Sequence, residues 1–181
     1  MSQMPDNVES LVILHYPDPR LREVARPLAD PADPGLPALV ERMKQLMHQA
    51  AGVGLAATQL GVPVRVFLAN PTREPGKEMV LVNPEVLLCE GWQETREGCL
   101  SVPDVTLKLR RRQRVLVRYQ DLAGQTRQHD ATGYLASIFQ HESDHLEGRL
   151  IIDRAGLVGR LAIRDTLKRL EENANAASGS R

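Results

Sequence analysis

The segment His141-Glu142-Ser143-Asp144-His145 constrains the possible folds of this chain more than any other feature. Two histidines four residues apart lie on one face of an α-helix and can share a metal ion. The glutamate beside the first histidine can act on a water that the metal activates. The alternative is a chance occurrence of HExxH on a surface helix, so the surrounding periodicity has to decide between the two.

The periodicity around this segment favours a metal-binding helix. Thr132 suits an N-cap and Gly148 a C-terminal stop, which predicts a helix between them. One stripe of this helix is polar and consists of Ser137, Gln140, Asp144 and Glu147. The other arc carries His141, Glu142 and His145 together with Tyr134, Leu135, Ile138, Phe139 and Leu146. Imidazoles and a carboxylate that face a core are costly unless they are paired, and a metal ion would pair them.

Two histidines are an incomplete site, because a catalytic metal usually has three protein ligands and a water. Metalloproteases with HExxHxxGxxH use a third histidine, but Ile151 occupies that position and excludes this pattern. Thermolysin-like proteases use a downstream glutamate, for which Glu171 and Glu172 are candidates, although both end a charged helix. Cys99 is the upstream candidate, yet such a cysteine is more often a small buried residue. The residues alone leave the third ligand open.

The order of the expected elements predicts an α+β fold. Helical periodicity covers 38–50 and 157–172, in addition to the HExxH helix. Strand-like runs cover 64–68, 79–82, 86–88 and 115–119. We therefore expect short, mostly antiparallel sheets packed around the HExxH helix, with an N-terminal and a C-terminal helix. The length of 181 residues suits a single domain over 1–172, and we expect the small polar tail over 173–181 to be disordered.

Charge and hydropathy narrow the classes of partner. The chain has 23 basic and 23 acidic residues, so no global field indicates a membrane or a specific nucleic acid as its main partner. The polar segment 1–10 lacks a signal-peptide core, and apolar runs stay well short of the ~20 residues of a membrane span. We therefore expect a cytoplasmic protein, in which Cys89 and Cys99 form no disulfide. Cys89 is interpreted as a structural thiol.

The sequence resembles the peptide deformylases through three separated motifs that occur in the family's order. The motifs are Gly52-Val53-Gly54-Leu55-Ala56-Ala57-Thr58-Gln59, Glu97-Gly98-Cys99-Leu100-Ser101 and Gln140-His141-Glu142-Ser143-Asp144-His145. The similarity extends from about Ile13 to Asp153, and the C-terminal helix is typical of a bacterial-type member. Each motif is moderately specific, and the three together are very specific.

The resemblance implies a hydrolase that removes the formyl group from the N-terminal formyl-methionine of new polypeptides and releases formate. Cys99, His141 and His145 would hold one divalent metal, with Fe(II) as the native ion and zinc or nickel as possible substitutes. Glu142 would take a proton from water and pass it to the leaving amine. The side chain of Gln59 and the backbone N–H of Leu100 would stabilise the oxygen of the tetrahedral intermediate.

The resemblance also suggests substrate-binding residues, with one departure. The expected substrate-binding set is Val53, Gly54, Gly98, Tyr134, Ser137 and Ile138, of which Ser137 is more polar than usual. The family usually carries a basic residue at the position of Thr106. One residue of the following basic cluster could substitute for it, and this cluster contains Lys108, Arg110, Arg111, Arg112 and Arg114.

The predicted C-terminal helix suggests a contact with the ribosome. Arg160, Arg164 and Lys168 are four residues apart and line up on one helix face, where they could meet ribosomal RNA. A solvated amphipathic helix is the alternative. For the whole chain, the competing functions are a thermolysin-like metalloprotease and a non-catalytic relative that keeps the metal as a structural staple. Intact Glu142 and Gln59 favour the enzyme, because a staple needs neither.

Overall fold

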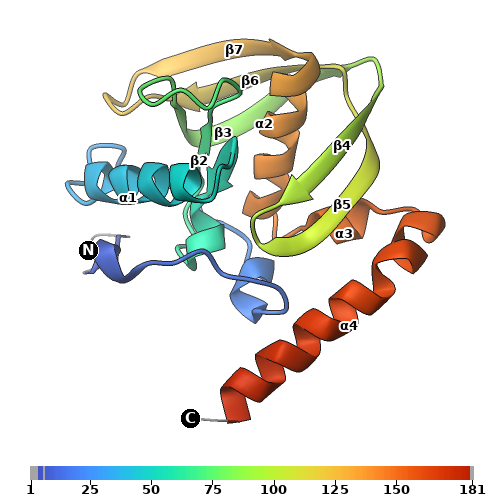
Figure 1. Cartoon of the computed structure of the whole chain (residues 1–181). Coiled ribbons are helices and arrows are strands. Elements are labelled where there is room, and N and C mark those ends of the chain that lie inside the picture. The colour runs from blue at the N-terminus through green and yellow to red at the C-terminus, as the bar shows by residue number, and fades with distance from the viewer. Residues whose placement is uncertain (1–3, 6, 180–181) are drawn as a thin grey trace.

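The computed structural model describes residues 4, 5 and 7–179 and has the predicted α+β architecture (Figure 1). Its helices are α1 (Leu36–Gln49), α2 (Gly133–Leu146), α3 (Ile151–Arg154) and α4 (Leu157–Gly179), with short 3-10 turns at Val8–Ser10, Pro19–Arg22 and Ala57–Leu60. Its strands are β1 (Gly54–Ala56), β2 (Val66–Ala69), β3 (Met79–Glu90), β4 (Gln93–Cys99), β5 (Val102–Arg111), β6 (Arg114–Gln120) and β7 (Thr126–Thr132). All strand pairings within the two sheets are antiparallel, as expected.

Helix α2 lies between two sheets, which places the HExxH segment in the middle of the molecule (Figure 1). The larger sheet has the order β1-β2-β3-β6-β7, and β4 and β5 form a separate hairpin. Phe139 of α2 is fully buried against Phe67 and lies in one core cluster with Val115 and Val117 of the larger sheet. This apolar contact fixes the rotation of α2 about its own axis. As a consequence, His141 and His145 face the hairpin.

The β4–β5 hairpin is fixed by its own apolar face. Along β5 buried and exposed residues alternate, and Val105, Leu107 and Leu109 point inward. They form a core cluster with Ile151 of α3 and Ile163 of α4. Burial of these side chains holds the hairpin against the C-terminal part of the chain, and Cys99 stands at the end of β4 within this framework.

Helix α1 supports the first glycine-rich motif from the other side. Leu39, Val40, Met43 and Met47 are fully buried and occur at helical spacing. They belong to a core cluster that includes Leu55 of β1. This packing fixes the loop and strand that precede Gln59.

Several elements differ from the sequence-based expectation. Strands β1, β4, β5 and β7 and the short helix α3 were not predicted. The sequences of β4 and β7 are polar and carry little apolar alternation, β1 and α3 are only three and four residues long, and the alternation of β5 was missed beside its basic residues. The expected strands at 79–82 and 86–88 are one strand, β3, in which irregular register accommodates Pro84. Helix α4 continues to Gly179 instead of ending at 172, because the added segment is rich in alanine and has no proline.

The expected tail over 173–181 is therefore helical up to 179, and residues 180 and 181 lie outside the described part of the chain. The division into a domain over 1–172 and a tail stays a prediction. Within the described residues, none of the helices has both the length and the hydropathy needed to span a bilayer.

Candidate metal centre and active-site pocket

Three side chains from β4 and α2 converge into a group that can hold a metal ion. The Sγ atom of Cys99 and one ring nitrogen each of His141 and His145 all lie within 4.8 Å of one another. Cys99 Sγ is 3.2 Å from His145 Nε2. One thiolate and two imidazoles suit zinc or iron better than magnesium or calcium, and they leave a coordination position open. The donor set and its spacing therefore fit one divalent transition-metal ion.

A buried carboxylate orients the first histidine. Glu97 Oε2 is 2.9 Å from His141 Nδ1, which leaves the other ring nitrogen, Nε2, for a metal. Arg111 donates two hydrogen bonds of 2.8 Å to the same carboxylate. Burial of Glu97 opposes its ionisation, but the hydrogen bonds from Arg111 and His141 outweigh burial and hold its pKa well below the usual range. Glu97 is thus a fixed anion behind His141.

The two histidines differ in their electrostatic environment. Burial lowers the pKa of His145 well below its usual value, so its imidazole is neutral, the form that binds a metal. Burial also disfavours the His141 cation, but hydrogen bonds to Cys99 and Glu97 outweigh burial and raise the pKa of His141. Thr58 Oγ1 donates to the carbonyl of His145 at 3.1 Å and ties this turn of α2 to the first motif.

The polar stripe of α2 has a structural role that the sequence did not reveal. Asp144 is buried, and Arg111 donates to it at 2.6 Å. Arg154 of α3 pairs with Asp144 as well. Two guanidinium groups compensate the negative charge of the buried carboxylate, so Asp144 does not need water to stabilise its charge. The stripe was recognisable in the sequence, but its arginine partners become neighbours only in the folded chain.

Glu142 is held next to the three ligands with one carboxylate oxygen unpartnered. The side chain is 4% exposed, and its Oε2 has no hydrogen-bond partner among the described residues. A Cβ atom at Gly54 would lie 2.3 Å from Glu142 Oε1, so the glycine creates the space for the carboxylate. Burial raises the pKa of Glu142 to about 7. A buried acid with a free oxygen beside a metal site suits proton transfer near neutral pH.

We expect Gly54→Ala to lower the catalytic rate constant, kcat, without unfolding the protein. The atoms in the way belong to the flexible end of Glu142, so the carboxylate will move while the backbone stays. A displacement of about 1 Å in a catalytic group can cost up to ~10²-fold, and kcat should fall within that range. Gly156→Ala is the matched control, because a methyl there meets nothing within 4 Å. Unchanged kcat in Gly54→Ala would show that the position of Glu142 is not limiting.

Gln59 is anchored beside Cys99 through both ends of its amide. Its Oε1 accepts from the N–H of Ala56 at 2.9 Å. Its Nε2 donates to Ser101 Oγ at 3.0 Å and lies 3.7 Å from Cys99 Sγ. The amide N–H group is thereby directed toward the ligand cluster, and Leu100 follows Cys99 directly along the chain.

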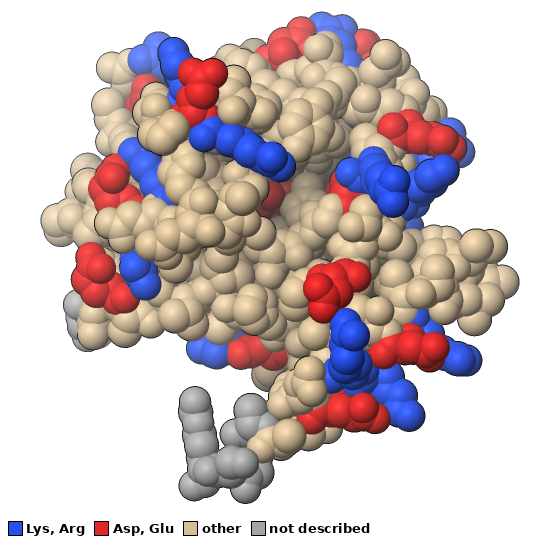
Figure 2. Space-filling view, viewed as in Figure 1, with Lys and Arg blue, Asp and Glu red and all other residues tan. Residues whose placement is uncertain are grey.

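A cavity of about 410 Å³ opens in front of these groups, and Figure 2 shows the corresponding hollow over α2. All six residues expected at the substrate site line it, namely Val53, Gly54, Gly98, Tyr134, Ser137 and Ile138. Gln59, Cys99, Leu100, His141 and Glu142 line it as well, whereas His145 lies behind them and is 2% exposed. Ser137 Oγ donates to the carbonyl of Tyr134 at 2.7 Å, so its hydroxyl is already used within the helix.

The basic residues at this cavity are not those that the sequence suggested. Arg73 and Arg96 line it, whereas Thr106 and all members of the following basic cluster do not. Arg96 comes from β4, which the sequence analysis missed. The signal for it was its spacing of two residues from Gly98, an expected substrate-site residue, because alternate residues of an extended strand face the same side.

The thermolysin-like choice of third ligand has no support in the geometry. Glu171 accepts a hydrogen bond from Tyr16 at 2.5 Å, and Glu172 lies 3.7 Å from Lys168. Neither glutamate lines the cavity.

Comparisons with known proteins agree with this arrangement. The profile of the polypeptide deformylase family matches residues 10–160. A peptide deformylase of Nitrosococcus oceani is 42% identical over 154 residues, which cover 85% of this chain and 92% of that protein. Among solved structures, a plant peptide deformylase has a TM-score of 0.90 at 37% identity, with 94% of both chains covered. A peptide deformylase from Legionella pneumophila has a TM-score of 0.83 at 36% identity, covering 90% of this chain and 96% of that one. The chain therefore belongs to the peptide deformylase family, whose members hydrolyse the N-formyl group of nascent peptides.

Proposed function

We propose that this cavity is where the chain removes the formyl group from N-formyl-methionyl peptides, with Cys99, His141 and His145 as metal ligands and Glu142 as the catalytic acid and base. The observation that carries the proposal is the buried, half-partnered carboxylate of Glu142 beside a cluster of one thiol and two imidazoles. A metal held only for stability would need no such carboxylate, because an unpaired buried oxygen costs free energy.

The metal that we propose for the cell is Fe(II), with zinc or nickel as substitutes. When bound, the ion supplies Lewis acidity toward water and the formyl carbonyl. The thiolate of Cys99 is the feature that favours a borderline or redox-active ion over a hard one.

The protein groups then account for the movement of protons and charge. Glu142 accepts a proton from the attacking water, whose oxygen forms a bond to the formyl carbon. The C–N bond breaks as Glu142 returns the proton to the leaving amine, and the products are formate and a free N-terminus. The Gln59 amide and the Leu100 backbone N–H donate to the carbonyl oxygen while it carries negative charge.

The methionine side chain would occupy the apolar part of the cavity, against Val53, Tyr134 and Ile138, with Ser137 beside them. Gly98 carries no side chain, so it leaves room for the backbone of the substrate, and Gly54 leaves room for the Glu142 carboxylate. Formate release from a formyl-methionyl tripeptide tests the proposal. Hydrolysis of internal peptide bonds in unformylated substrates, without formate release, would indicate a protease instead.

We further propose that the protein works in the cytoplasm and meets nascent chains through α4. Arg160, Arg164 and Lys168 lie on this helix as expected, but each has local partners. Arg160 donates to the carbonyls of Ala155 and Asp153, Arg164 lies 3.3 Å from Asp165, and Lys168 lies 3.7 Å from Glu172. These contacts reduce the charge that the stripe presents, so the contact with ribosomal RNA should be weak and sensitive to salt.

Reversal of Arg160, Arg164 and Lys168 to glutamate tests this contact. Binding to ribosomes in low salt should fall by about tenfold or more, because three phosphate contacts would be lost. Formate release from a short peptide should stay unchanged, because these residues lie outside the catalytic cavity. Ribosome binding that survives the triple reversal would show that the stripe is only a solvated face.

A further inference from the structure

A second and larger cavity lies on the opposite face of α2 from the catalytic pocket. It measures about 760 Å³, and its α2 residues are Gln140, Ser143, Asp144 and Glu147. The catalytic pocket is lined by a different set of α2 residues, which includes Ile138, His141 and Glu142. Six arginines and three acidic residues line the second cavity, so its walls carry an excess of positive charge in a chain whose formal net charge is zero.

All three acidic residues of this cavity are already paired with arginines. Asp144 pairs with Arg111 and Arg154, Glu147 with Arg65 at 2.7 Å, and Glu85 with Arg118 at 2.6 Å. Three other arginines of the cavity, Arg110, Arg112 and Arg149, form no ion pair with a carboxylate in the described part of the chain. Glu94 is opposite Arg110 in the β4–β5 ladder but makes no salt bridge with it. The cavity therefore presents three cations that are free to meet an anion.

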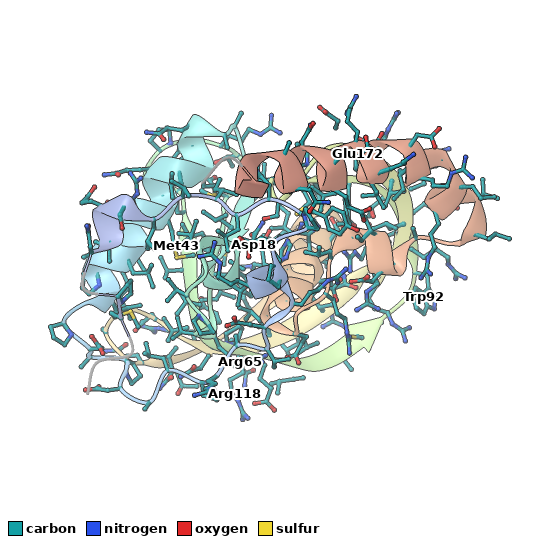
Figure 3. The ribbon with its side chains drawn as sticks, turned by 90° about the horizontal axis from the view of Figure 1, so that it is seen from below. Asp18, Met43, Arg65, Trp92, Arg118 and Glu172 are labelled. Atoms are coloured by element: carbon teal, nitrogen blue, oxygen red, sulfur yellow. The ribbon has the colours of Figure 1, made fainter. Side chains whose placement is uncertain are left out.

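An exposed tryptophan lies among these cations. Trp92 is 53% exposed, and Figure 3 shows it at the periphery of the molecule. The guanidinium carbon of Arg112 lies 3.9 Å from the centre of the indole ring, and that of Arg110 lies 4.8 Å from it. The backbone of Arg112 is fixed by Gln140, which accepts from its N–H at 2.8 Å and donates to its carbonyl at 2.9 Å. The arrangement is a supported platform of planar groups.

We propose that this cavity, which we call the arginine–tryptophan groove, binds single-stranded RNA without reading its sequence. Guanidinium groups bind phosphates through paired hydrogen bonds, and Arg110, Arg112 and Arg149 supply three of them. The indole and the guanidinium groups that stack on it offer faces on which bases can stack. An acidic peptide would use the charges but would not stack on the exposed part of the indole.

The polar side chains of the groove explain why its binding should not depend on sequence. Sequence reading requires free donors and acceptors for the edges of bases. The amide of Gln140 is used by Arg112 and Ala136, and that of Asn83 by Leu28 and Gln120. The groups that remain free are guanidinium donors, two of which stack on the indole, and an aromatic ring. Without free acceptors, they suit phosphates and base faces better than the mixed donor and acceptor edges of bases. This inference does not depend on the proposed catalytic roles.

The test is binding of a fluorescein-labelled oligouridylate of about 12 nucleotides to the full chain in low salt. Reversal of Arg110, Arg112 and Arg149 to glutamate should weaken binding by about tenfold or more and lower the slope of log K against log salt by about two. Trp92→Ala should weaken it by about fivefold or more, whereas Trp92→Phe should retain most of it. Formate release should be unchanged in all these variants, which also shows that they fold.

The controls separate the groove from other sources of binding. Reversal of Arg160, Arg164 and Lys168 changes the same number of charges on α4 and should weaken binding of the oligouridylate much less than reversal of the groove arginines, because local partners reduce the charge that this stripe presents. A polyglutamate peptide of equal charge should compete poorly, because it cannot stack on Trp92. The proposal is overturned if the parent chain does not bind the oligouridylate, if reversal of the groove arginines has no effect, or if polyglutamate competes as well as RNA.

Discussion

Glu142→Gln is expected to keep its metal and to lose at least ~10²–10⁴-fold in kcat, the contribution of general acid–base catalysis. The glutamine fills the same space beside Gly54, so the ligand cluster should remain intact. It cannot accept a proton from water, however, and so it cannot deliver one to the leaving amine. The loss should appear mainly in kcat, because Glu142 acts on water and the leaving amine and contributes little to the methionine pocket.

Two measurements on the same sample make this prediction specific. Metal analysis should give the same metal content for the variant and the parent, because the carboxylate is not a ligand in our assignment. Formate release should be measured with saturating substrate, which separates kcat from KM. Near-normal kcat would contradict the proposed mechanism, and loss of the metal would contradict the assignment of Glu142 as a non-ligand.

Cys99→Ala should cost metal affinity and activity together. Loss of a partner that only orients a ligand costs roughly 10–100-fold in metal affinity, and loss of a direct ligand should exceed that. The chain provides a matched control in Cys89→Ala, because Cys89 is exposed on β3 and lines the arginine–tryptophan groove instead of the catalytic pocket. Metal content and formate release should be unchanged in this control. If the two variants exchange their behaviour, the ligand assignment is wrong.

The sequence predicted the helix of the site better than its surroundings. Periodicity alone indicated a helix between Thr132 and Gly148 with His141 and His145 on an inward arc, and α2 has this form. Local spacing carries this information, because residues four apart on a helix are neighbours whatever the rest of the chain does. The exposed fraction of Tyr134, 56%, was not predictable, because it depends on how far the cavity opens at that end of α2.

The hydrogen bonds and ion pairs that orient the metal ligands could not be predicted from local sequence patterns. Glu97 was visible in the second motif, but its contacts with His141 and Arg111 join residues that are 44 and 14 positions apart. Arg111 stood in a run of basic residues, which more often indicates a solvated face, yet it is 4% exposed between Glu97 and Asp144. Such pairs depend on the register of β4 against β5, and the polar sequence of β4 gave no sign that it was a strand.

The central claim is that Cys99, His141 and His145 hold a metal on which removal of the formyl group depends. The most direct test measures metal content and formate release together, on protein purified without oxygen and then depleted of and reloaded with metal. We predict about one transition-metal ion per chain and formate release from a formyl-methionyl peptide that rises in proportion to bound metal. Full activity in the metal-free chain, or a metal-loaded chain that releases no formate, would contradict the claim.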